Sequence, residues 1–194
     1  MRTYIDEEAL MKLIQRQGYL DFLRRNRNRP IVKVVSGIRR CGKSTLFRLF
    51  KDELLSEGVK PEQIISINFE ELEYEHLREY HALYQYILER MQPDEMNYIF
   101  LDEIQHVDQF HRVVDSLFVK ENTDLYITGS NAYFMSSDIA TLLTGRYVEI
   151  QMLPLSFSEF YHSKYDGNQY SLIPAYESYL RESSFPYTQQ LGGE

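Results

Sequence analysis

Short apolar runs alternate with helically spaced apolar residues along most of the chain. Five of the runs are typical of buried strands, because they are β-branched or aromatic and only four to six residues long; they cover residues 31–35, 64–69, 98–101, 125–128 and 147–152. Helical spacing covers residues 46–54, 74–91 and 137–143, and Asp108 is expected to cap a further helix that runs to Phe118. Such alternation predicts an α/β fold with a mainly parallel sheet and helices on both faces.

Helical patterns also flank this core. One over residues 6–22 assigns residues 1–29 to an N-terminal helical segment that packs on a core of residues 30–152. Its end carries four arginines between residues 24 and 29, which fit the carboxyl end of a helix better than a phosphate site. Patterns at residues 157–161 and 174–180 assign residues 153–194 to the start of a C-terminal helical region.

A glycine-rich loop follows the first predicted strand and precedes a predicted helix. It fits the pattern G-x-x-x-x-G-K-[ST] in full, with the sequence Gly37-Ile38-Arg39-Arg40-Cys41-Gly42-Lys43-Ser44-Thr45. Glycines let the backbone wrap closely, so that successive N–H groups and the helix N-terminus converge on phosphate oxygens. Lys43 is expected to reach the β- and γ-phosphates of a nucleotide, and the Ser44 hydroxyl to ligate Mg²⁺.

Three residues inside this loop admit two interpretations each. Arg39 and Arg40 either place positive charge near the phosphates or face solvent. Cys41 is more simply explained as a small side chain that fills the loop than as a redox group, although cations and a helix N-terminus favour a thiolate.

An acidic pair ends the third predicted strand. Asp102 and Glu103 lie at the carboxyl end of that strand, where parallel sheets bind ligands. An aspartate there can hold Mg²⁺ through water, and the next glutamate can orient and polarise an attacking water. Many strands end in acids, but the phosphate loop upstream makes this pair specific. A base aimed at water favours hydrolysis over transfer to a small molecule.

Two further positions have both a functional and a structural interpretation. Ser130 and Asn131, after the fourth predicted strand, either contact the γ-phosphate and position water or form an ordinary turn. Arg146 precedes the fifth predicted strand and either reaches the nucleotide of a neighbouring subunit or caps a helix.

Composition narrows the class of protein. The chain of 194 residues has a formal net charge of −8, which argues against non-specific binding to nucleic acids and anionic membranes. Its single cysteine excludes an internal disulfide. The N-terminus does not look like a secretory signal, and no apolar run approaches the roughly 18 residues of a membrane helix. We therefore expect a cytoplasmic protein without a membrane partner.

The motifs together resemble those of AAA+-like P-loop ATPases, and in particular a bacterial and archaeal family of predicted ATPases called AAA domain 14. The similar segments follow the same order as in that family and cover residues 36–45, 100–105, 128–131, 145–146 and 153–157. The resemblance implies ATP or ADP with Mg²⁺ as ligands. It implies the following sites: Walker A at Gly37–Thr45, Walker B at Asp102-Glu103, a sensor at Ser130 or Asn131, and an arginine finger at Arg146.

The same resemblance carries expectations about architecture. It implies a three-layer P-loop NTPase fold whose five-stranded parallel sheet has the order 5-1-4-3-2. Members of the family commonly carry a further C-terminal domain, so we expect that this chain stops short of one, near residues 184–186. Homo-oligomers and contacts with a protein partner or with that domain are open expectations.

Three functions fit these observations. The first is an ATPase whose hydrolysis drives conformational change, with Glu103 as the base. The second is a nucleotide-gated switch that hydrolyses slowly or only with a partner. The third, a small-molecule phosphotransferase, is disfavoured because no arginine-rich lid insertion follows the central helices.

Overall fold

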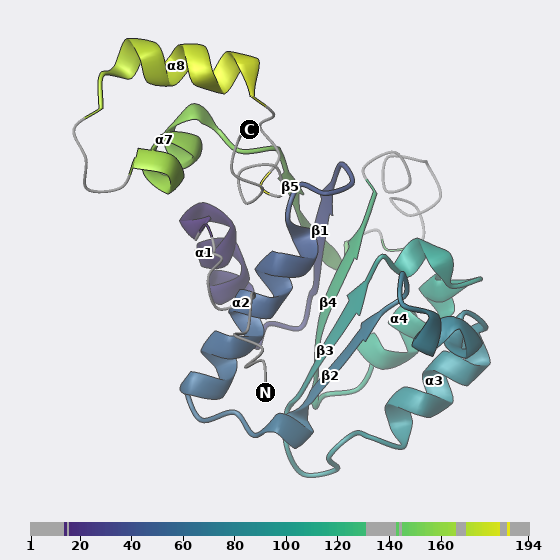
Figure 1. Ribbon diagram of the computed structural model, residues 1–194. Coiled ribbons are helices and arrows are strands. Elements are labelled where there is room, and N and C mark those ends of the chain that lie inside the picture. Colours follow the sequence, from purple (N-terminus) through teal and green to yellow (C-terminus); the bar gives the residue numbers. More distant parts are fainter. Residues whose placement is uncertain are drawn as a thin grey trace, which may run out of the picture.

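A central parallel sheet organises the molecule, and helices cover both of its faces (Figure 1). The computed structural model describes residues 14, 16–130, 143, 145–165, 170–182 and 186. Within those residues the sheet has five strands in the order β2-β3-β4-β1-β5, which confirms the predicted order 5-1-4-3-2 read in reverse. The strands are β1 (Val32–Gly37), β2 (Ile64–Asn68), β3 (Asn97–Asp102), β4 (Thr123–Gly129) and β5 (Tyr147–Met152).

Each face of the sheet has its own apolar core. Helices α1 (Gln17–Asn26) and α2 (Lys43–Ser56) lie on one face, and α3 (Tyr80–Leu88) and α4 (Phe110–Phe118) lie on the other (Figure 1). Alternate residues of β3 point into the two cores, Phe100 toward α2 and Leu101 toward α4. A strand covered on both faces must be apolar throughout, which explains the continuous runs in the sequence.

Aromatic packing fixes the position of α2 over the sheet. The rings of Phe100 and Tyr126 are stacked with centroids 4.6 Å apart. From α2, the Phe47 ring lies 5.1 Å from that of Phe100, and the Phe50 ring lies 5.4 Å from that of Tyr126. Because α2 begins directly after the glycine-rich loop, this packing also fixes the loop at the carboxyl edge of the sheet.

Beyond β5, two helices form a separate hairpin. They are α7 (Phe157–Tyr165) and α8 (Leu172–Arg181), and they lie near α1 at the upper left of Figure 1. Phe160 of α7 packs against Tyr179 of α8 with ring centroids 5.3 Å apart. The proposed boundaries at residues 29 and 152 stay a prediction.

Two predicted helices differ from those observed. The single helix predicted over residues 74–91 is divided into a 3₁₀ helix, Leu72–Leu77, and α3, because Glu79 caps α3 by accepting a hydrogen bond from the Ala82 N–H at 2.9 Å. Asp108 was predicted to cap α4, but Gln109 occupies that position with φ of 49°. The Asp108 N–H instead donates to the Arg78 carbonyl at 2.9 Å.

Other predicted helices agree with the structure or fall outside the described residues. Helix α1 ends at Asn26, four residues beyond the predicted end at residue 22. In the predicted segment 6–22, residues 6–13 and 15 lie outside the described residues. In the predicted segment 137–143, only residue 143 is described. No helix in the described part of the chain has both the length and the apolar character needed to cross a membrane.

Candidate functional site

The glycine-rich loop connects the end of β1 to the first turn of α2. Arg40 and Gly42 have left-handed backbone conformations, with φ of 65° and 104°. Alternation of this kind turns successive N–H groups toward one concavity, which is an anion-binding nest. A Cβ on Gly37 would lie 2.4 Å from the Met152 carbonyl oxygen of β5, so only glycine fits where the loop leaves the sheet.

Lys43 places its charge inside this loop. Its side chain is 3% exposed, and its ammonium donates to the carbonyl oxygens of Gly37 and Ile38 at 3.1 and 3.3 Å. The same nitrogen lies 3.0 Å from Oε1 of Glu103. The structure therefore brings together two residues that are 60 positions apart in the sequence. Lys43 was predicted to reach the phosphates, and Glu103 was predicted to orient the attacking water.

The acidic pair is held at the end of β3 by a residue of β4. The Thr128 hydroxyl donates to Asp102 Oδ1 and accepts from the Glu103 N–H at 2.9 Å. Glu103 has φ of 54°, a conformation that is uncommon for a residue other than glycine. The hydrogen bond from its N–H to Thr128 offsets part of that strain, and the strained turn aims the carboxylate at Lys43.

The Asp102 carboxylate is buried beside Ser44. Burial raises the pKa of Asp102, while hydrogen bonds from the Ser44 and Thr128 hydroxyls oppose that shift. A hydroxyl and a carboxylate side by side are hard oxygen donors of the kind that Mg²⁺ prefers. The described residues contain no group of three or more His, Cys, Asp or Glu that could hold a metal ion. Mg²⁺ in nucleotide sites usually keeps waters and substrate phosphates among its ligands.

Lys43, Ser44 and Glu103 line an open pocket. Its volume is about 430 Å³, within the usual range for small-molecule sites, and its lining residues are Arg39, Arg40, Gly42, Lys43, Ser44, Thr45, Glu70, Glu103 and Pro186. Arg39 lies at the rim, 78% exposed, and pairs with Glu70 at 2.8 Å. Cys41 is fully buried and burial raises the pKa of its thiol, which supports the packing interpretation over a redox one.

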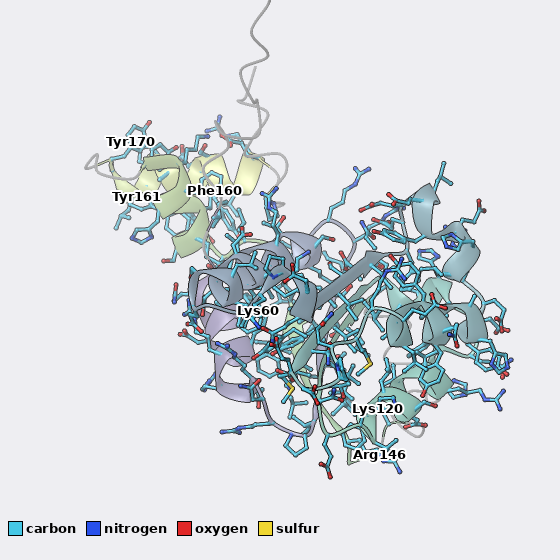
Figure 2. All side chains as sticks on the ribbon, turned by 90° about the horizontal axis from the view of Figure 1, so that it is seen from below. Lys60, Lys120, Arg146, Phe160, Tyr161 and Tyr170 are labelled. Carbon is cyan, nitrogen blue, oxygen red and sulfur yellow. The ribbon has the colours of Figure 1, made fainter. Side chains whose placement is uncertain are left out.

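Ser130 and Arg146 are not among the residues that line this pocket. Ser130 follows β4 at the carboxyl edge and is half-buried, while Asn131 is outside the described residues. Arg146 precedes β5 at the opposite edge, where its carbonyl accepts from the Val32 N–H at 2.8 Å and its guanidinium lies 2.9 Å from Asp115. In Figure 2, viewed from below, Arg146 lies on the same side as Lys120 and away from Phe160 and Tyr161 of α7. Within one chain, Arg146 does not join the pocket.

Two residues near the acidic pair were missed in the sequence. Thr128 was included in a predicted strand and in the family motif but was given no role, although a buried polar side chain at a strand end is itself a signal. Parallel register pairs Leu101 with Ile127, which places Asp102 beside Thr128. Gln105 was included only in the family motif, yet its amide nitrogen lies 2.5 Å from Glu103 Oε2.

Comparison with known proteins gives sequence relatives and similar structures. The profile of a family described as an AAA domain matches residues 29–161. An uncharacterised protein of Haemophilus influenzae is 42% identical over 176 residues, which are 90% of this chain and 44% of that protein. An uncharacterised protein of Methanocaldococcus jannaschii is 32% identical over 134 residues, which are 66% of this chain and 28% of that protein. The chain thus spans less than half the length of either relative.

A solved structure has a similar fold. A Walker-type ATPase of Pyrococcus abyssi superposes with a TM-score of 0.61 and 17% identity, covering 90% of this chain and 65% of that one. At such identity the likeness shows the fold, which agrees with the sheet order described above.

Proposed function

The chain belongs to the AAA domain family, and from this premise we propose that it binds ATP with Mg²⁺ and hydrolyses the bond between the β- and γ-phosphates. Family membership supports ATP binding and an ATPase activity in general terms. One observation supports the specific proposal most directly: Lys43 and Glu103 lie 3.0 Å apart at the mouth of the glycine-rich loop. A cation for the phosphates and a base for water are thus within reach of one reacting bond.

The loop amides and four side chains have distinct parts in this proposal. The loop amides between Gly37 and Lys43 hold the β-phosphate, and Lys43 leaves Glu103 to bind the β- and γ-phosphate oxygens. Ser44 and Asp102 would hold Mg²⁺, which would supply positive charge against the negative charge that develops on the phosphates. Glu103, released from Lys43, accepts a proton from the water that attacks the γ-phosphorus.

Arg146 and a second copy of the chain are a further part of the proposal. Since Arg146 lies at the sheet edge away from the pocket, it can act as an arginine finger only on the nucleotide of a neighbouring copy. In that case specific activity rises with protein concentration, and Arg146→Ala abolishes the rise. A rise of equal size in Arg146→Ala would remove the residue from this role.

Calorimetric titration with ATP and ADP in the presence of Mg²⁺ tests the proposal. We expect Lys43→Ala to weaken ATP binding by about 10- to 100-fold, because it removes a charge-assisted contact to phosphate. Lys60→Ala is the matched control, since Lys60 is an exposed lysine that pairs with Glu95 and does not line the pocket. Its ATP affinity should equal that of the wild type.

The products distinguish hydrolysis from the alternatives. Release of inorganic phosphate into water is expected, whereas transfer of the γ-phosphate to another molecule would indicate a phosphotransferase. Tight nucleotide binding with negligible phosphate release would favour the nucleotide-gated switch. A folded wild-type chain that binds neither ATP nor ADP would contradict the whole proposal.

A further inference from the structure

Gln105 contacts the proposed base, and the roles given above leave it unused. It lies in the 3₁₀ turn Ile104–His106 that directly follows Glu103. Its side-chain nitrogen donates to Glu103 Oε2 at 2.5 Å. Chemistry fixes the direction of this bond, because an ionised carboxylate only accepts hydrogen bonds. The amide nitrogen of Gln105, rather than its oxygen, therefore faces the carboxylate.

The two carboxylate oxygens of Glu103 have different partners. Lys43 Nζ lies 3.0 Å from Oε1, whereas Gln105 binds Oε2. When Lys43 turns to the phosphates of a nucleotide, it leaves Oε1, and the bond to Gln105 can still hold Oε2. The oxygen that is released is then the one available to a water molecule.

The side-chain oxygen of Gln105 argues against the explanation that this residue serves packing alone. Its oxygen is buried and accepts no hydrogen bond from any residue that the structure describes. A buried acceptor without a donor is costly, so packing alone does not favour an amide at this position. The hydrogen bond that the Gln105 N–H donates to Glu103 explains an amide at this position better than packing does.

We propose that Gln105 is a positioning residue for ATP hydrolysis: its amide holds one oxygen of Glu103, so that the other faces the attacking water. This inference rests on the proposed function, because Gln105 acts through Glu103. Position matters because a base must lie within hydrogen-bond reach of the proton that it accepts. A displacement of about 1 Å can lower a rate by about 100-fold.

Gln105→Met tests the role, because methionine has a similar shape but no N–H to donate. We expect kcat to fall by about 10- to 100-fold, while KM and the calorimetric Kd for ATP change by less than about twofold. Gln105→Asn keeps an amide and should recover part of the lost kcat. Gln85→Met is the matched control: it removes an amide–carboxylate bond of 3.0 Å to Glu89 on α3, and kcat should not change.

A double substitution separates positioning from a general effect on the fold. If Gln105 acts through Glu103, adding Gln105→Met to Glu103→Gln leaves the residual turnover unchanged. A further loss in the double variant, or a joint loss of kcat and ATP affinity in Gln105→Met, would overturn the positioning role. So would wild-type kcat in Gln105→Met, and the proposed function would then still stand, provided that Glu103→Gln is inactive. Wild-type turnover in Glu103→Gln would instead refute Glu103 as the base, and this inference with it.

Discussion

Glu103→Gln is expected to lower the turnover of ATP by about 100- to 10,000-fold, the range typical of a lost general base. Glutamine keeps the shape of the side chain but cannot take the proton of the attacking water. ATP affinity should be preserved or increased, because Lys43 Nζ, 3.0 Å from Glu103 Oε1, no longer has a carboxylate that competes with the phosphates. Steady-state phosphate release and calorimetric titration measure the two quantities separately.

Glu70→Gln is the matched control for this experiment. It makes the same chemical change in another carboxylate of the same pocket, but Glu70 lies at the rim and pairs with the exposed Arg39. An exposed ion pair contributes little, so turnover should stay close to that of the wild type. If Glu103→Gln and Glu70→Gln had equal turnover, Glu103 would not be the base.

The fold could be predicted because its strongest signals are local. Each strand is an apolar run between helical patterns, and alternating strands and helices leave few topologies other than a parallel sheet. The glycine-rich loop is also local, since its nest is formed by consecutive backbone groups between Gly37 and Lys43. The order of the strands was not local information; it came from the family resemblance and is confirmed.

Contacts between distant segments could not be predicted in the same way. Thr128 reaches Asp102 because the register of two parallel strands places them side by side, and no sequence spacing encodes that register. The break between the 3₁₀ helix and α3 depends on Glu79, whose capping role is invisible in a continuous apolar stripe. Arg146 shows that a residue's place in the sequence does not decide its function. The sequence placed it before β5, but did not reveal that the pocket lies at the opposite edge of the sheet.

Arg16 is the least predictable of these contacts and joins three parts of the chain. Its guanidinium forms two hydrogen bonds to Glu159 of α7, at 2.8 and 3.1 Å. It also donates to the Cys41 carbonyl in the glycine-rich loop at 3.2 Å, and to those of Leu153 and Pro154 at 2.6 and 3.2 Å. Through Arg16, a rearrangement of the loop on nucleotide binding would therefore change the contacts of Glu159 in α7. Such a connection is compatible with the expectation from the sequence that hydrolysis drives conformational change, which stays a prediction.

Arg16→Ala is expected to lower the free energy of unfolding by about 3–5 kcal/mol, as when one partner of a buried ion pair is removed. Arg16 is 5% exposed and Glu159 24% exposed, so the loss leaves three carbonyl oxygens without this donor and leaves Ser156 as the remaining donor to the Glu159 carboxylate. Chemical denaturation measures the change. ATP affinity should also fall, because the Cys41 carbonyl is no longer held.

The matched control is Arg24→Ala. Arg24 makes the same two-point contact with a carboxylate, to Glu53 at 2.6 and 2.7 Å, but its side chain is 37% exposed. A pair so exposed should contribute at most about 1 kcal/mol. Equal losses in the two variants would mean that burial of Arg16 does not matter, and would contradict its role as the link between the loop and α7.

Acid provides an independent check on the same contact. Burial raises the pKa of Glu159, but hydrogen bonds from Arg16 and Ser156 outweigh it, and the folded-state pKa lies below the ordinary value of 4.5. The folded protein therefore gains stability from the ionised carboxylate above about pH 4.5, and loses that gain as the pH falls through the lower folded-state pKa. The difference in unfolding free energy between wild type and Arg16→Ala should accordingly be largest near neutral pH and narrow in acid. A difference that stays constant down to the acid transition would show that the Arg16–Glu159 charge pair is not the source of the stabilisation.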